Sequence, residues 1–159
     1  MKIKAVSLVT AILLAAASAL EASPKSSAPF QKALGDATML ASLNPAWSVH
    51  RTMGDSMGDF FGNNSLILVQ QAEFAAIEAG MMIVYRNREG ELISHKVVAR
   101  NGDTLATRGV ANLRNDPDPV TAENLVGAIF GVFHTSGAPA GEVTTAGGAT
   151  IPTALCKSY

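Results

Sequence analysis

Cysteine, charged residues and aromatic residues are all scarce in this chain. Of its 159 residues one is cysteine (Cys156), 16% are charged and 6% are aromatic. A single cysteine excludes an internal disulfide framework and a multi-cysteine metal site, and the three histidines lie too far apart in the sequence to resemble a zinc centre. The sequence therefore indicates neither a metal nor another cofactor.

A basic run is also missing. Twelve Lys and Arg residues stand against 13 Asp and Glu, which gives a formal charge of -1, and no basic cluster of the kind that follows a phosphate backbone occurs. We therefore expect no nucleic-acid partner. A chain of this length has room for one buried core and is too short for two ordinary domains.

Long hydrophobic runs are absent except at the amino terminus. Two lysines precede an apolar stretch over residues 5–20, and Ala17-Ser18-Ala19 offers the small residues typical of a signal cleavage site. We interpret residues 1–19 as an export signal, either cleaved after Ala19 or retained as a membrane anchor, although a full span needs about 20 residues. Both outcomes place the remainder outside the cytoplasm, in the periplasm or the extracellular medium, and a retained anchor would hold it at a membrane surface.

Two stretches have the composition of linkers. Residues 20–46 are rich in Ala, Ser and Pro without a sustained period, which predicts a tether with one helical turn around residues 30–41. Residues 135–159 are rich in Gly, Ala, Thr and Pro, which predicts a loosely ordered tail containing Cys156. Between them, residues 47–134 show short apolar runs separated by Gly and Asn, a pattern typical of a β-rich domain.

Turn signals organise this domain. Gly90 and the pair Asn101-Gly102 mark tight turns, so the strands around them are predicted to form a three-stranded meander. We expect a mostly β fold with one short helix. The predicted strands cover residues 65–69, 81–86, 91–99, 104–108 and 125–133, and residues 70–79 are predicted to form a short helix or a helical turn.

Ser56, His95 and Asp116 are the residue types of a serine hydrolase. Ser56 lies in a turn that contains Gly54, His95 lies in the middle of a predicted strand, and Asp116 lies in a proline-rich loop. A serine hydroxyl is a poor nucleophile at neutral pH and needs a base within hydrogen-bond reach. An imidazole base works best when a carboxylate holds its tautomer and stabilises the imidazolium. Together the three residues indicate acyl-transfer chemistry, whereas Ser56 alone would be an ordinary turn residue.

Lys96 is an alternative base. Successive side chains of a strand point to opposite faces, so His95 and Lys96 cannot both reach Ser56. An imidazole is largely neutral at pH 7, whereas a lysine base would need a pKa well below its usual value of about 10.4. We therefore favour His95 and retain Lys96 as the alternative.

The order of five short blocks resembles type I signal peptidases. The resemblance is to their Ser-His-Asp branch, which occurs in the endoplasmic reticulum, in archaea and in some bacteria. In that family the nucleophile lies in a Ser-Met pair and the base in a His-Arg-Val segment. The blocks span about residues 47–133 and are Ser56-Met57, Gly80-Met81-Met82-Ile83-Val84-Tyr85, Ser94-His95-Lys96-Val97-Val98, Thr107-Arg108-Gly109-Val110-Ala111-Asn112 with Asp116, and Glu123-Asn124-Leu125-Val126-Gly127.

The resemblance carries expectations for fold and site. It implies a coiled β-sheet or partial barrel, and an exported serine endopeptidase that cleaves peptide or preprotein substrates after small residues. It further implies Ser56 as nucleophile, His95 as general base and Asp116 as the orienting carboxylate. Gly54 and the backbone N–H of Ser56 would lie at the oxyanion site, and no cofactor is implied.

The chain departs from the family pattern at three positions. Asp59 stands where the family has a proline, and Met81 and Val110 stand where it has aspartates. These departures support a second interpretation, in which the chain is a non-catalytic binding or accessory module with the same fold. A third is a maturation protease that acts on one pilin-like or conjugative partner. The sequence does not indicate an oligomeric state.

Several other residues are predicted to be structural. His50 and His134 have no partner by spacing, so we expect surface positions for both. Asp103 and Asp118 adjoin glycine or proline and are expected to be turn residues. Core filling is expected of Met81, Met82, Phe60, Phe61, Phe130 and Phe133.

Overall fold

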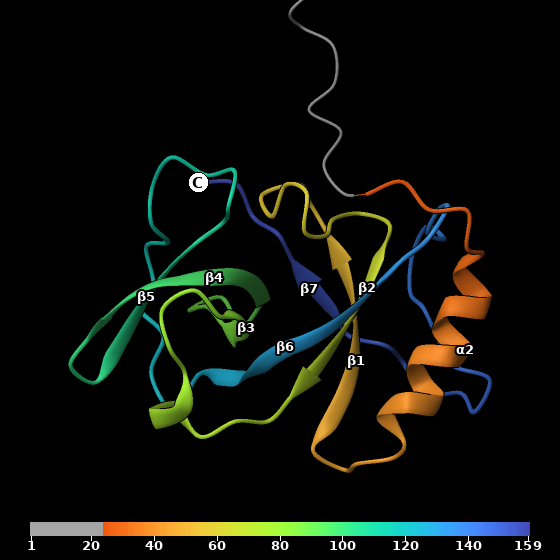
Figure 1. Cartoon of the computed structure of the whole chain (residues 1–159), viewed down its shortest axis with the longest axis horizontal. Coiled ribbons are helices and arrows are strands. Elements are labelled where there is room, and N and C mark those ends of the chain that lie inside the picture. Colours follow the sequence, from red (N-terminus) through yellow and green to blue (C-terminus); the bar gives the residue numbers. More distant parts are fainter. Residues whose placement is uncertain (1–23) are drawn as a thin grey trace, which may run out of the picture.

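The computed structural model describes residues 24–159, a mostly β structure with 36% strand and 11% helix (Figure 1). This confirms the predicted mostly β fold with one short helix. The helix α2 (Phe30–Ala41) comes before all the strands. The strands are β1 (Trp47–Met53), β2 (Ser65–Gln70), β3 (Met82–Arg86), β4 (Leu92–Asn101), β5 (Thr104–Arg108), β6 (Leu125–His134) and β7 (Thr153–Leu155).

Six of the strands close into a barrel. Neighbours follow the order β3-β6-β2-β1-β7-β4, and the additional pairing of β3 with β4 completes the ring, while β5 extends the sheet beyond β4. The pairs β1–β2, β2–β6, β6–β3 and β3–β4 are antiparallel. In contrast, β7 is parallel to both of its neighbours, β1 and β4. The closure between β1 and β4 therefore depends on the last strand of the chain.

The predicted meander is present as β3, β4 and β5. Gly90 and Gly102 have φ values of +80° and +60° at the two turns, a conformation that glycine adopts without steric cost. The β3–β4 register places Ile83 opposite His95. Because side chains alternate along a strand, Ile93, His95 and Val97 share one face of β4, and all three are buried. The meander thus holds the middle of β4 rigidly within the core.

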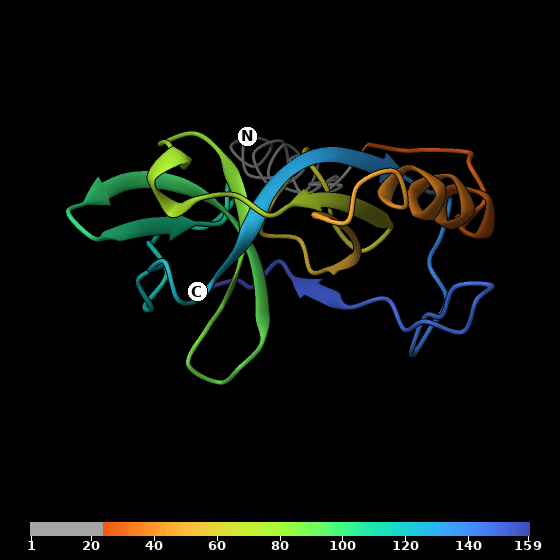
Figure 2. The ribbon, with the colours of Figure 1, turned by 90° about the horizontal axis from the view of Figure 1, so that it is seen from below.

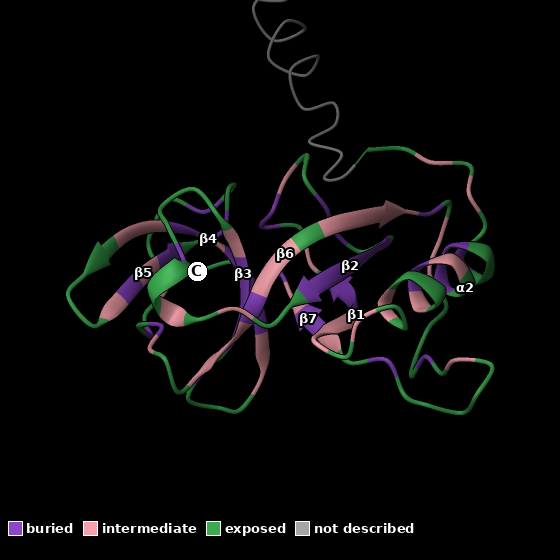
Figure 3. Cartoon of the chain, turned by 60° about the horizontal axis from the view of Figure 1, so that its bottom comes forward, coloured by how far each residue is buried: buried purple, intermediate pink, exposed green. Residues whose placement is uncertain are grey.

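The strand β2 is buried on both faces (Figure 3). Leu66 and Leu68 belong to a cluster with α2, whereas Ile67 and Val69 point the other way into a cluster that includes Met57. This explains why β2 is a continuous apolar run and shows no alternation. The packing also ties the turn that carries Ser56 to the centre of the barrel, because Met57 follows Ser56 directly and is fully buried.

The expectation of a tether over residues 20–46 was wrong for residues 30–41, which form the full helix α2. Its buried residues, Phe30, Ala33, Leu34 and Ala37, recur at the three- and four-residue spacing of one helix face. Two of the four are alanines, so the face carries little hydrophobic contrast with the alanine-rich sequence around it.

The expectation of a loose tail over residues 135–159 was also wrong. Val143, Ile151, Ala154 and Cys156 are buried, and β7 belongs to the barrel. The partners of β7 lie roughly 60 to 100 residues earlier in the chain, so nothing in the local pattern indicates the pairing.

Smaller differences concern single elements and residues. Of the short helix or helical turn predicted within residues 70–79, the structure has the turn, as the 3₁₀ helix Phe74–Ala76. His50 is buried in β1 and is not a surface group; it stands in register with Ile67 of β2, on the side of the sheet away from α2. Phe60, Phe130 and Met81 are exposed large hydrophobic residues, so core filling is wrong for these three.

The amino-terminal prediction falls outside the described part of the chain. Residues 1–19, interpreted as a signal or anchor, precede residue 24, where the description begins. Among residues 24–159 no helix has the length and apolar character needed to span a membrane.

Candidate active site

Ser56 lies in the turn that follows β1. Gly54 has a φ of +106°, and the N–H of Gly58 donates to the carbonyl of Asp55, which closes the turn around the serine. The backbone carbonyl of Ser56 accepts a hydrogen bond of 2.8 Å from the N–H of Ala111, in the loop after β5. The serine is therefore fixed by both strand β1 and the loop that leads to Asp116.

Ser56, His95 and Asp116 form a hydrogen-bonded row. Ser56 Oγ lies 2.8 Å from His95 Nε2, and His95 Nδ1 lies 2.7 Å from Asp116 Oδ2. The ring of His95 is fully buried and Ser56 is 1% exposed. The three residues that the sequence analysis singled out are thus brought together from β4 and two separate loops at the spacing that base-assisted attack requires.

The carboxylate of Asp116 is held by three donors. Besides His95, the hydroxyls of Thr107 and Tyr85 donate to Oδ2 at 2.6 and 2.8 Å. The backbone also contributes, since the N–H of Asp116 donates to the carbonyl of Thr107. Oδ1 is buried without a partner among residues 24–159. All three side-chain hydrogen bonds to Asp116 are therefore accepted by the same oxygen, Oδ2.

Two opposing effects set the charge of Asp116. Burial acts to raise its pKa, but the hydrogen bond and charge of His95, with the bonds from Thr107 and Tyr85, hold the pKa below its ordinary value. Burial raises the pKa of Tyr85, so its hydroxyl stays protonated and remains a donor. The carboxylate is consequently ionised at neutral pH.

An ionised Asp116 determines the tautomer of a neutral His95. The carboxylate can only accept a hydrogen bond, so the ring proton lies on Nδ1 and Nε2 keeps its lone pair. The Ser56 hydroxyl then donates to Nε2. This is the arrangement in which imidazole can remove the serine proton.

Lys96 lies on the opposite face of β4 from His95. It is half-buried and stands in register with Met82 of β3 and Arg108 of β5. Within residues 24–159 the hydrogen-bond partner of the Ser56 side chain is the ring of His95. Of the two candidate bases, His95 has the geometry to act.

The structure corrects the expected role of Gly54 at the oxyanion site. Its N–H donates to Asn63 Oδ1 at 2.9 Å and is not available to a substrate oxygen. A Cβ at Gly54 would lie 2.2 Å from the carbonyl oxygen of Cys156, so glycine is required here for close backbone approach. In contrast, within residues 24–159 the N–H of Ser56 has no acceptor, which leaves it as the candidate oxyanion donor.

Two residues beside Ser56 were not predicted from the sequence. A Cβ at Gly109 would lie 2.8 Å from Ser56 Oγ and 2.7 Å from Asn112 Nδ2, so both atoms border the same small space. Asn112 Nδ2 donates to the backbone carbonyl of Lys157 at 2.9 Å. Both residues belong to the block Thr107-Arg108-Gly109-Val110-Ala111-Asn112. The sequence of this block does not indicate that it folds against Ser56.

The three departures from the family pattern lie outside the row. Val110 is 43% exposed and Met81 is 38% exposed, and Asp59 is also exposed. The carboxylate beside His95 is that of Asp116, six positions after Val110. The lack of an aspartate at Met81 and at Val110 therefore leaves every hydrogen bond of the row in place.

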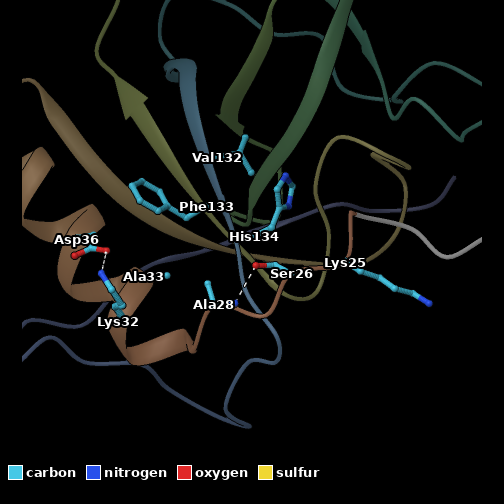
Figure 4. Close-up of a pocket in the computed structure, with 9 residues that line it drawn as sticks. All are labelled: Lys25, Ser26, Ala28, Lys32, Ala33, Asp36, Val132, Phe133 and His134. Carbon is cyan, nitrogen blue, oxygen red and sulfur yellow. Dashed lines mark hydrogen bonds and ion pairs between the residues drawn. The ribbon is translucent and has the colours of Figure 1, made fainter.

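The other two histidines also contact serines. Ser48 Oγ lies 2.9 Å from His50 Nε2, and Ser65 Oγ lies 3.2 Å from His134 Nδ1. His134 borders a surface hollow between the start of α2 and the end of β6 (Figure 4). Among residues 24–159 neither histidine has a carboxylate on its second nitrogen, and no group of His, Cys, Asp or Glu is arranged to hold a metal ion.

Asp118 takes part in an ion pair with Arg88, with Oδ1 2.5 Å from Nε, and its side chain is almost fully buried. It thus fixes the β3–β4 turn to the loop after Asp116, a stronger structural role than the simple turn residue expected.

Comparison with known proteins adds no assignment, because no protein-family model matches the sequence and no curated protein matches it.

Proposed function

We propose that this protein is an exported serine endopeptidase that acts by acyl transfer. The observation that supports the proposal is the row of Ser56, His95 and Asp116, with distances of 2.8 and 2.7 Å and a carboxylate held by two further hydroxyls. The resemblance to signal peptidase I adds the substrate class, which is exported or precursor proteins cut after small residues.

The proposed reaction has two halves. Ser56 Oγ attacks the peptide carbonyl carbon while His95 Nε2 takes the hydroxyl proton, and Asp116 stabilises the imidazolium. The oxygen that becomes negative is stabilised by the N–H of Ser56. The proton then passes from His95 to the leaving amine as the C–N bond breaks. Water, activated by the same imidazole, hydrolyses the acyl-enzyme and restores the serine.

Two substitutions test this function. Ser56→Ala and His95→Ala are each expected to lower the rate of cleavage of an extended peptide with small residues before the scissile bond by about 10³-fold or more. Ser48→Ala is the matched control, since it removes a serine that also contacts a histidine. Equal cleavage by the wild type and both active-site variants would refute the proposal.

The pH profile distinguishes the two candidate bases. With His95 as base, activity falls as the pH is lowered, because a protonated imidazole cannot accept the serine proton. Activity that rises only above about pH 8 would instead assign the base to Lys96.

A non-catalytic accessory module is the second candidate function. The burial of Ser56 and His95 favours it, because a substrate carbonyl cannot reach Ser56 Oγ without a movement of the residues that cover it. A serine-reactive phosphonate separates the two functions. Covalent labelling of the wild type by the phosphonate, lost in Ser56→Ala, supports the peptidase. Absence of labelling, even where the residues that cover Ser56 have moved away, supports the accessory module.

A further inference from the structure

Residues 153–159 of the chain pass beside the candidate active site. The first part of this segment, β7, lies between β1 and β4 and pairs with Met53 and Ile93 through Leu155. The N–H of Cys156 donates to the carbonyl of Met53 at 2.6 Å, which extends the pairing by one residue. From there the chain runs toward the loop between β5 and β6 (Figures 1 and 2).

The direction of this segment leads it toward the row of Ser56 and His95. Ser56 lies three residues after the end of β1, and His95 lies two residues after Ile93, while β7 is parallel to both strands. A strand in this position therefore advances toward both side chains. The ring of Tyr159 meets the ring of His95 edge-on, with 6.2 Å between the ring centroids.

The segment is bound as an extended peptide would be bound. Main-chain hydrogen bonds hold it on the β1 side, and the Asn112 amide donates to the carbonyl of Lys157. Ala154 and Cys156 are buried in the cluster of Met57, while Leu155 packs against the cluster on the other side. Addition of a strand to free sheet edges, with alternate side chains in pockets, is a general mode of peptide recognition.

The side chains of the segment match the substrate class of the proposed function. Ala154 and Cys156, two small residues, point the same way at alternate positions and are 0% and 3% exposed. The proposed peptidase is expected to take small residues before the scissile bond. The site between β1 and β4 is therefore filled by a sequence of the kind it would bind.

The attachment beyond β7 is weak. Lys157 forms an ion pair with Glu91, and both side chains are more than one-third exposed, at 37% and 36%. Such exposed pairs contribute little to stability. On the β4 side, β7 has one paired position, Ile93 with Leu155. Release of the segment therefore breaks this ion pair, one paired position on β4 and three on β1, and it exposes Ala154 and Cys156.

We propose that residues 153–159 are an intramolecular ligand of the peptide-binding site, and that an incoming extended peptide binds by replacing them between β1 and β4. This inference rests on the proposed function and names the site of its substrate. The apparent affinity for a peptide is then the intrinsic affinity reduced by the fraction of molecules in which the site is open.

A charge reversal in the full chain tests the inference without turnover. In a Ser56→Ala background, Lys157→Glu places a carboxylate against Glu91 and is expected to raise the affinity for a fluorescent peptide with alternate small residues. The expected change in Kd is about two- to five-fold, since exposed pairs are weak. Adding Glu91→Lys to Lys157→Glu restores the pair and is expected to return Kd to the starting value.

The matched control is Lys32→Glu, which breaks the exposed pair of Lys32 with Asp36 on α2. It is expected to leave peptide affinity unchanged. If Lys157→Glu also leaves the affinity unchanged, or if Lys32→Glu changes it equally, the inference is overturned.

Hydrogen exchange supplies the second measurement. Saturating peptide is expected to increase exchange at the amides of residues 153–157 while β2 stays protected, because the peptide takes the hydrogen bonds of β7. A bound peptide with undiminished protection of these amides would place it elsewhere and refute the inference. Because Ser56→Ala removes catalysis, a wild type that cleaves no peptide refutes the peptidase function alone and leaves this binding result standing.

Discussion

His95 and His134 each contact a serine hydroxyl, at 2.8 and 3.2 Å, yet their surroundings differ. His95 is fully buried and has Asp116 on its second nitrogen, whereas His134 is half-buried at the edge of the hollow in Figure 4. In a third serine–histidine pair, of Ser48 with His50, the histidine is buried but likewise has no carboxylate. Proximity of the two residue types is therefore common in this small barrel and does not by itself indicate catalysis.

The carboxylate is what separates the three sites. Burying an ionised carboxylate is costly unless hydrogen bonds compensate, and here two hydroxyls and an imidazole converge on one oxygen. A network of this kind fixes the orientation of His95. The other two histidines have no such network. Substitutions at the network can show how much of the proposed activity depends on it.

Asp116→Asn is expected to have the largest effect. An amide can donate to Nδ1 and so favour the tautomer in which Nε2 carries the proton and cannot accept from Ser56. The expected loss in kcat is about 10³- to 10⁴-fold, measured by peptide cleavage at neutral pH. Asp118→Asn is the control, because Asp118 is buried nearby but pairs with Arg88. Equal losses in the two variants would mean that Asp116 has only a structural role.

The pH dependence of stability should reveal the burial of His50. Burial, with the charge of Arg86, lowers the pKa of His50 from 6.5 to about 4. Between these values the unfolded chain binds a proton that the folded chain does not, so the free energy of unfolding falls as the pH is lowered from 6.5 to about 4. The loss is expected to reach about 3 kcal/mol.

His50→Gln should remove this part of the acid sensitivity while retaining a polar group next to Ser48. Urea denaturation at pH 7 and pH 4 measures the difference. The same slope in the variant and the wild type would show that other groups cause the loss, including Asp116, whose lowered pKa also makes acid destabilising.

Thr107→Val and Tyr85→Phe should have the smallest effects on activity. Each removes one donor to Asp116 Oδ2 and leaves His95 in place. Loss of a hydrogen bond to a charged group is expected to lower kcat by about 10-fold in each variant and to shift the acid limb of the pH profile. An unchanged pH profile would assign both hydroxyls to folding alone. Thr121→Val, at a hydroxyl outside the row, is the control.

The sequence predicted the strands of the meander and the three residues of the row, and failed where contacts are distant. The turns at Gly90 and Asn101-Gly102 are encoded in adjacent residues, so β3, β4 and β5 could be placed within two residues of their observed ends. Ser56, His95 and Asp116 could be selected because their residue types and order suit one reaction. The distances between them depend on the closed barrel, which no local pattern determines.

The failures have a common physical origin. Half of the buried face of the helix α2 is alanine and strand β7 has only three residues, and both are stabilised by contacts with strands elsewhere in the sequence. Gly109 and Asn112 lie beside Ser56 only because the loop after β5 folds against it, and the sequence does not indicate this fold. Long-range packing therefore decided the very parts of the structure that complete the site.

The position of Cys156 gives the molecule a built-in chemical reporter. Its thiol is 3% exposed, and burial, with the charge of Asp55, raises its pKa to about 12, so it is protonated and shielded from alkylating reagents while the barrel stays closed. It is also the sole thiol of the chain. The rate at which a maleimide modifies this protein in native buffer therefore measures how often the segment that contains Cys156 separates from β1 and β4.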